Sequence, residues 1–202
     1  MSLNRQFLYL SSDDAQLSLG LGEAKPSERL SFAVLPAPEQ ASQVEAMTRS
    51  LLEQGRVSGE PLSGDSLQVT LHHLGDYAGL PPSLLGRARA AGERLRMEPF
   101  DVRFDRLGTF GARGRRIACA LRGDDGVRGL YPLQRALARR MAEQGIVGDV
   151  RFTPQIPLLQ VDSALPVQRV APVQWQVCEL VLVRTFLGQG RQQFEGRWPL
   201  AA

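Results

Sequence analysis

Short strand-like segments outnumber the helices that could connect them, and this ratio is the strongest constraint on the fold. Alternating apolar and polar residues predict strands over 29–35, 67–74, 100–107, 116–121, 152–160, 173–185 and, at an edge, 191–198. Apolar stripes at helical spacing predict three helices, within 36–55, 82–95 and 127–143. Because parallel neighbours need a crossover between them, this excess of strands favours antiparallel pairing. The sequence therefore predicts an α+β fold.

Three of these segments carry further predictions. The segments 100–107 and 116–121 flank a glycine-rich turn and are expected to form a hairpin. The segment 173–185 is predicted as one long strand, in which alternation places Trp175 on the apolar face, away from Gln174 and Gln176. We therefore expect Trp175 to be largely buried.

The chain offers few metal ligands and no disulfide framework. Cys119 and Cys178 are far apart in apolar stretches, which predicts two buried free thiols. The only histidines are the adjacent His72 and His73, so a zinc site made of His and Cys would lack ligands. We expect neither a metal nor a cofactor.

The length and the apolar pattern bound the class of protein. With 202 residues the chain can bury a core without disulfides, and it contains no run of 18 apolar residues. Polar residues at 11–14 interrupt the region where a signal peptide would need an apolar core. These features predict a soluble, cytoplasmic protein with no membrane contact, and we expect a monomer.

Arginine supplies nearly all of the positive charge, since Lys25 is the single lysine among 24 basic residues. The arginines are mostly scattered among acidic residues. The exception is a basic stretch, which could line a nucleic-acid groove or belong to a solvated hairpin; its members are Arg113, Arg115, Arg116, Arg122 and Arg128.

A four-residue pattern occurs twice, 87 residues apart. The two copies are Gln68-Val-Thr-Leu and Gln155-Ile-Pro-Leu, and each lies in or beside a predicted strand. So short a match arises readily by chance, but the spacing is about half of the body of the chain and indicates an internal duplication.

Five segments in order resemble the 2H phosphoesterase superfamily, in particular its bacterial 2'-5' RNA ligase branch, the RNA 2',3'-cyclic phosphodiesterases. They are RLSFAVLPAP, SLQVTLHHLGD, FDRLGTFGARGRRIACAL, FTPQIPLLQ and VQWQVCELVLVRTFLGQGRQQFEGRWPL. The resemblance implies a bilobal fold with pseudo-twofold symmetry, in which two antiparallel-rich sheets with flanking helices enclose a central cleft. It also divides the chain into an N-terminal extension, 1–27, and one domain, 28–202.

The signature positions of that family are mostly changed here. The resemblance places Gln68 and Gln155 at the two catalytic histidine positions, Thr70 and Pro157 at the two Thr/Ser positions, and Gln160 at an arginine position. In the family one histidine activates the attacking water and the other protonates the departing 2' oxygen. A glutamine amide cannot exchange a proton near neutrality, so we expect this chemistry to be lost or very weak.

The neighbouring residues do not restore the lost groups. Strand alternation predicts that His72 shares the face of Gln68 but lies about 13 Å along the strand, at about 3.3 Å per residue. His72 is therefore predicted to contribute to ligand binding and not to replace Gln68, and His73 is predicted to be a core histidine on the opposite face. Asp76 follows Gly75 and is interpreted as a solvated turn residue.

Three hypotheses about function remain. The first is a degenerate enzyme whose cleft binds RNA ends, nucleotides or another phosphorylated small molecule through Gln68, Thr70, Gln155 and arginines of the cleft. The second is an active cyclic phosphodiesterase that uses other residues. The third is a cleft that binds nothing, in which both glutamines are ordinary polar strand residues.

Overall fold

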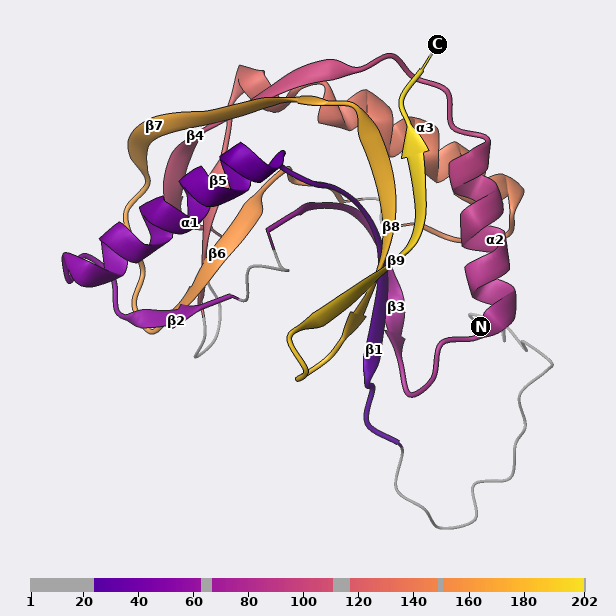
Figure 1. Ribbon diagram of the computed structural model, residues 1–202, viewed down its shortest axis with the longest axis horizontal. Helices are drawn as coiled ribbons and strands as arrows, with labels where there is room; N and C mark the ends of the chain where they lie inside the picture. Colours follow the sequence, from indigo (N-terminus) through magenta and orange to yellow (C-terminus); the bar gives the residue numbers. More distant parts are fainter. Residues whose placement is uncertain (1–23, 63–66, 111–116, 149–150, 202) are drawn as a thin grey trace, which may run out of the picture.

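The computed structural model describes residues 24–62, 67–110, 117–148 and 151–201 (Figure 1). Its helices are α1 (Pro38–Glu53), α2 (Pro82–Glu93) and α3 (Leu130–Glu143), with a short 3-10 turn η2 (Asp125–Val127) before α3. Its strands are β1 (Glu28–Val34), β2 (Gly59–Pro61), β3 (Val69–Tyr77), β4 (Phe100–Thr109), β5 (Ile117–Arg122), β6 (Ile156–Val161), β7 (Gln168–Val177), β8 (Glu179–Phe186) and β9 (Arg191–Pro199). The α+β prediction is confirmed, and no described helix has the length and apolar character to cross a membrane.

Two antiparallel sheets make up the framework. One has the order β3-β1-β8-β9 and the other the order β2-β6-β5-β4-β7. Without the short edge strand β2, the two orders match strand for strand, with β3 and β6 in equivalent places. These are the strands that follow Gln68 and Gln155, so the duplication predicted from the sequence is present in the fold.

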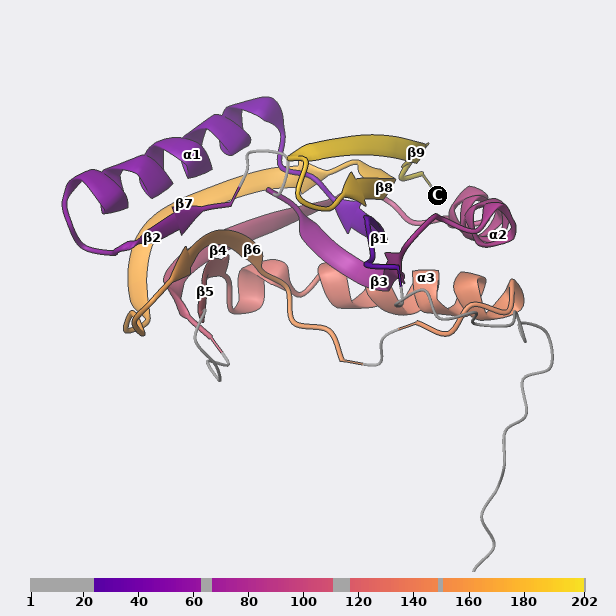
Figure 2. The same ribbon diagram turned by 90° about the horizontal axis from the view of Figure 1, so that it is seen from below.

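Each helix is placed by an apolar stripe that the sequence shows. Pro38 begins α1, and Val44 and Leu51 of this helix are buried against β6 and β7 of the five-stranded sheet. In the same way α3 follows β5 but packs on β3 of the four-stranded sheet and on α2, which lies against β8 and β9. Figure 2 shows α1 and α3 on opposite sides of the strands. Each of these two helices thus covers the sheet that does not contain its preceding strand.

The two motif strands bulge at equivalent positions. Ala33 pairs with Thr70 while its neighbour Phe32 pairs with His72, which leaves Leu71 as the extra residue of β3. On β6 the register shift between Cys119 and Ala120 leaves Leu158 extra in the same way. Both extra residues are the leucine of the repeated four-residue pattern. A bulge places two successive residues opposite one and shifts the alternation of faces, so residues after each leucine change sides.

The predicted long strand 173–185 is wrong, because the chain changes sheets within it. Strand β7 ends at Val177 in the five-stranded sheet, and β8 begins at Glu179 in the four-stranded sheet. Cys178 connects the two strands and is exposed, whereas Cys119 is buried, so the prediction of two buried thiols holds for Cys119 only. Apolar residues continue on both sides of Cys178, so the sequence pattern is unbroken there. An unbroken pattern does not show that β7 and β8 pair with strands of different sheets. The sequence also missed β2.

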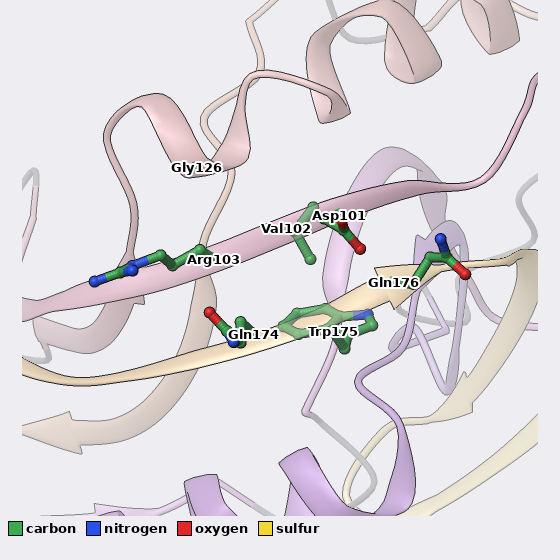
Figure 3. A pocket seen from close by; sticks show the side chains of 7 residues that line it. All are labelled: Asp101, Val102, Arg103, Gly126, Gln174, Trp175 and Gln176. Carbon is green, nitrogen blue, oxygen red and sulfur yellow. The ribbon is translucent and has the colours of Figure 1, made fainter.

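The predicted faces of β7 are confirmed. Trp175 is 7% exposed and its ring stacks on Phe104 with 5.3 Å between centroids, while Gln174 and Gln176 are exposed. Figure 3 shows Trp175 beside Val102, its partner on β4. The predicted hairpin is confirmed by the antiparallel pairing of β4 with β5. Three arginines of the basic stretch, Arg113, Arg115 and Arg116, lie outside the described residues.

Candidate functional site

A hollow of about 390 Å³ brings together residues from both copies of the repeated pattern. We call it the central hollow, and its lining residues are Arg29, Ser31, Leu62, Gln68, Thr70, His73, Pro157, Thr185 and Gln192. Gln68 and Thr70 come from the first copy and Pro157 from the second. The fold therefore gathers the two motifs at one place, although their strands belong to different sheets.

Two residues that line the central hollow have buried polar atoms for which the described residues offer no hydrogen-bond partner. Gln68 is 9% exposed, and its amide nitrogen donates to the Thr70 hydroxyl over 3.3 Å, but its buried Oε1 atom has no hydrogen-bond partner among the described residues. The same holds for the buried hydroxyl of Ser31. A buried polar group without a partner costs about 1–3 kcal/mol.

Gln155 lies in a different environment from Gln68. Its Oε1 accepts two hydrogen bonds from the Arg122 guanidinium, at 3.1 Å from Nε and 2.8 Å from Nη2. Register explains the contact, because Leu121 on β5 pairs with Ile156 on β6, so the next residues meet beyond the end of the ladder. Pro157, two residues later, lines the central hollow. That Gln155 also reaches the ligand of that hollow stays a prediction.

The predicted faces of the two histidines are reversed. His72 is 1% exposed, and its Nε2 lies 3.0 Å from the backbone oxygen of Gln134 in α3. His73 is the one that lines the central hollow. The bulge at Leu71 is the physical reason, because it moves the residues after it to the other face. The prediction that His72 contributes to ligand binding is therefore wrong, and its place on the cleft face is taken by His73.

The same bulge explains the position of Gln160. Gln160 follows Gln155 by five residues, as His73 follows Gln68, and each pair is separated by one bulged leucine. By this correspondence Gln160 is on the face of Pro157. It is partly buried on β6, paired with Glu60 of β2 and Ala118 of β5. Its role in ligand binding stays a prediction.

A charged cluster that the sequence did not predict stands beside His73. The Arg29 guanidinium binds both carboxylate oxygens of Asp76, at 2.7 and 2.8 Å, and His73 Nε2 lies 2.8 Å from Asp76 Oδ1. The hydrogen bonds from Arg29 hold the pKa of Asp76 well below its usual range. Asp76 is thus a residue of β3 and not a turn residue. Arg29 begins one predicted strand and Asp76 lies just beyond the end of another, so their opposite charges were the available signal, but the pairing of the two strands was not known.

We expect Asp76→Asn to lower the free energy of unfolding at pH 7 by about 1 kcal/mol or less, because both partners are partly exposed. A carboxylate with a lowered folded pKa contributes stability above its unfolded pKa, about 3.9, and loses it as the pH falls below that value. The difference between the two proteins in urea unfolding should therefore shrink below about pH 4. A difference that grew in acid would contradict the assignment.

Among the described residues, no group of three or more His, Cys, Asp or Glu side chains is arranged to hold a metal ion. The chemistry available at the central hollow is therefore that of amides, hydroxyls, one imidazole and one paired guanidinium.

Several solved structures of other proteins resemble this chain, although no protein-family model and no curated protein matches it. A phosphoesterase is 25% identical over 88% of this chain and 100% of its own, with a TM-score of 0.66. E. coli LigT, a 2'-5' RNA ligase, gives the same values in its complex with 3'-AMP, and has also been crystallised with ATP, NADP+ and phosphate. A protein of Thermus thermophilus is 24% identical over 85% of this chain and 97% of its own, with a TM-score of 0.69. The chain therefore has the LigT-like 2H phosphoesterase fold, which supports its place in the 2H phosphoesterase superfamily.

Proposed function

We propose that this protein is a degenerate member of the 2'-5' RNA ligase branch, which binds a phosphorylated ligand in the central hollow and lacks the two-histidine hydrolysis of the family. The ligand classes in view are RNA ends, nucleotides and other phosphorylated small molecules. The proposal keeps the cytoplasmic monomer that the sequence predicts.

The observation that carries the binding role is the lining of the central hollow. Ser31 and Gln68 line it, each has a buried polar atom without a hydrogen-bond partner among the described residues, and the Thr70 hydroxyl accepts a hydrogen bond from Gln68. Hydroxyl and amide groups can donate to phosphate oxygens and accept from ribose hydroxyls. The LigT complexes with 3'-AMP, ATP, NADP+ and phosphate support this ligand class, because those proteins share the fold.

Loss of hydrolysis follows from the residue types at the two motif positions. General acid and base catalysis contributes about 10²–10⁴ in rate for each group, and an amide can perform neither role near neutral pH. The Gln155 oxygen is in addition engaged by Arg122. The first motif keeps a hydroxyl at Thr70, so ligand contacts can persist where proton transfer does not.

A second candidate is an active cyclic phosphodiesterase, favoured by the position of His73. This imidazole lines the central hollow, and its Nε2 lies 2.8 Å from Asp76 Oδ1, so a carboxylate orients the ring as in many acid–base sites. The two candidate functions differ in whether the protein hydrolyses a cyclic phosphate. Hydrolysis of a 2',3'-cyclic nucleotide that is lost in His73→Gln would support the enzyme, and rates equal to buffer would support the binding protein.

Thr70→Val and Gln68→Leu should each weaken the binding of 3'-AMP roughly tenfold to a hundredfold, the value of a hydrogen bond to a charged group. Gln68→Leu should not lower the free energy of unfolding, because it removes a buried oxygen for which the described residues provide no hydrogen-bond partner. Calorimetric titration measures the first quantity and urea unfolding the second. Thr48→Val in α1 is the matched control, and its affinity should equal that of the wild type. Unchanged affinity in both variants of the hollow would contradict the proposal.

A further inference from the structure

We propose that the exposed thiol of Cys178 is a modification site, where a small carboxylate-bearing thiol occupies an adjoining hollow and is held by a mixed disulfide. We call this site the junction hollow, because it lies where the chain passes from β7 to β8. It measures about 310 Å³, and its wall comes from the segment 35–38 and from Trp175, Gln176, Cys178, Glu179 and Arg197. The inference goes beyond the proposed function, because the junction hollow and the central hollow have no lining residue in common.

The change of sheets leaves the Cys178 side chain accessible. Cys178 lies between β7 and β8, which belong to different sheets, and it is exposed. Its Sγ donates to the backbone oxygen of Gln176 at 3.6 Å and to Oε1 of the same residue at 3.4 Å. Gln176 also lines the junction hollow, so these contacts hold the sulfur at its wall. Cys119 is different, because it is buried and burial raises the pKa of its thiol to about 11.

A buried donor of a residue in the same wall lacks a partner. Trp175 is 7% exposed, and its Nε1 atom has no hydrogen-bond partner among the described residues. Figure 3 shows the ring nitrogen at the end of the ring toward Gln176, away from Gln174 and Arg103. An indole N–H can only donate, so the group that satisfies it must be an acceptor such as a carboxylate or a carbonyl oxygen. A ligand of the junction hollow with such an oxygen would provide the missing partner.

The start of α1 favours a negatively charged ligand. Ala37 precedes this helix of 16 residues and provides no side-chain cap, and both Ala37 and Pro38 line the junction hollow. The N–H groups and the dipole at an uncapped helix start attract anions. Glu179 in the same wall would repel an anion, but Arg197 binds its carboxylate at 2.6 Å. Glu39, in the first turn, is exposed and lies outside the wall, so a carboxylate is the favoured ligand group.

The size of the hollow and the thiol chemistry indicate the class of modifier. A volume of about 310 Å³ is at the lower end for small-molecule sites, so it admits a short thiol peptide and not a folded partner. The Cys178 thiolate attacks one sulfur of a small disulfide, whose S–S bond breaks as the mixed disulfide forms. The other half leaves as a thiolate and takes up the proton that Cys178 lost. Cys178 is thereby oxidised, and the leaving half of the small disulfide is reduced to a thiol.

The test compares oxidised glutathione, a disulfide that carries carboxylates, with cystamine, a disulfide that carries ammonium groups and no carboxylate. Mass spectrometry with peptide mapping measures the rate of mixed-disulfide formation in the folded chain and in the chain unfolded by urea. The folded protein should form its adduct at Cys178, with Cys119 unmodified. Its preference for oxidised glutathione over cystamine should exceed that of the unfolded chain by roughly tenfold or more, the value of a hydrogen bond to a charged group.

Two variants test the wall of the junction hollow. Trp175→Phe keeps an aromatic ring but removes the N–H, and it should lose most of the preference for oxidised glutathione. Arg197→Gln removes the partner of Glu179, whose charge then repels a carboxylate, and it should lower the preference as well. Arg191→Gln is the matched control, because it removes an arginine of the same strand that stacks on Phe186 outside the junction hollow. It should change the preference by less than about twofold.

Three results would overturn the inference. An equal preference in the folded and unfolded chains would mean that Cys178 is an ordinary exposed thiol. Adducts that form on Cys119 as fast as on Cys178 in the folded protein would remove the selectivity for the site. Equal effects of Arg197→Gln and Arg191→Gln would show that the wall of the junction hollow does not contribute. None of these results bears on the proposed function, because none involves the central hollow.

Discussion

Replacing Gln68 and Gln155 together by histidine is expected to create measurable hydrolysis of a 2',3'-cyclic phosphate. Each imidazole supplies an acid or a base worth about 10²–10⁴ in rate, and both are needed in one turnover, so single replacements should do much less. The double variant should nevertheless remain weak. A histidine at 155 would stand next to Arg122, whose charge disfavours the protonated imidazole, and Pro157 supplies no hydroxyl.

Adding Pro157→Thr should therefore raise kcat/KM above that of the double variant. Steady-state hydrolysis, measured with protein whose fold is checked by circular dichroism, gives the comparison. Gln192→His is the control, because it places an imidazole in the central hollow but outside the two motif positions. It measures the hydrolysis that an added histidine produces by itself in the hollow. A folded triple variant that binds the cyclic phosphate but never hydrolyses it would mean that the cleft has diverged beyond its motifs.

Trp175→Ala should lower the free energy of unfolding by about 3–5 kcal/mol, as a large-to-small change in a packed core. The ring is 7% exposed and stacks on Phe104, so its removal leaves a cavity beside Phe104 on the apolar face of β4 and β7. Chemical unfolding in urea gives the value, provided that the m-value is unchanged. A loss below about 1 kcal/mol would show that the ring does not belong to the core.

Two further variants serve as controls for Trp175→Ala: one tests the opposite face of β7, and the other tests the polar nitrogen of the Trp175 ring. Gln174→Ala changes the exposed neighbour on the opposite face and should alter stability by no more than about 0.5 kcal/mol. The buried Trp175 ring nitrogen has no hydrogen-bond partner in the part of the chain that the structure describes, so Trp175→Phe keeps an aromatic ring and removes an unsatisfied donor. Trp175→Phe should therefore lower the free energy of unfolding much less than Trp175→Ala does.

The sequence predicted the elements better than the connections between them. Apolar stripes located all three helices, and alternation located most strands, because both periods are local properties of the chain. The change of sheets at Cys178 is not local, since it depends on which strands lie on either side. Strand β2 was missed because three residues are too few to show a period.

The sequence predicted only part of the central hollow, again because some of its features are not local properties of the chain. Gln68, Thr70 and Pro157 meet in the central hollow, but the bulge at Leu71 reversed the faces of His72 and His73. A single extra residue leaves no mark in composition or hydrophobicity. The contact between Gln155 and Arg122 depends on strand register, which the sequence of one chain did not supply.

The crossed packing of α1 and α3 limits how the cleft can move. Each helix is joined by the chain to one sheet and packed on the other, so rotating the lobes apart would break both helix interfaces at once. Hinge motion usually needs few contacts across the moving boundary, and here α1 and α3, which bury residues such as Val44 and Leu137, contact the opposite sheet. We therefore expect ligands to enter a preformed opening, and the two lobes to unfold together as one cooperative unit.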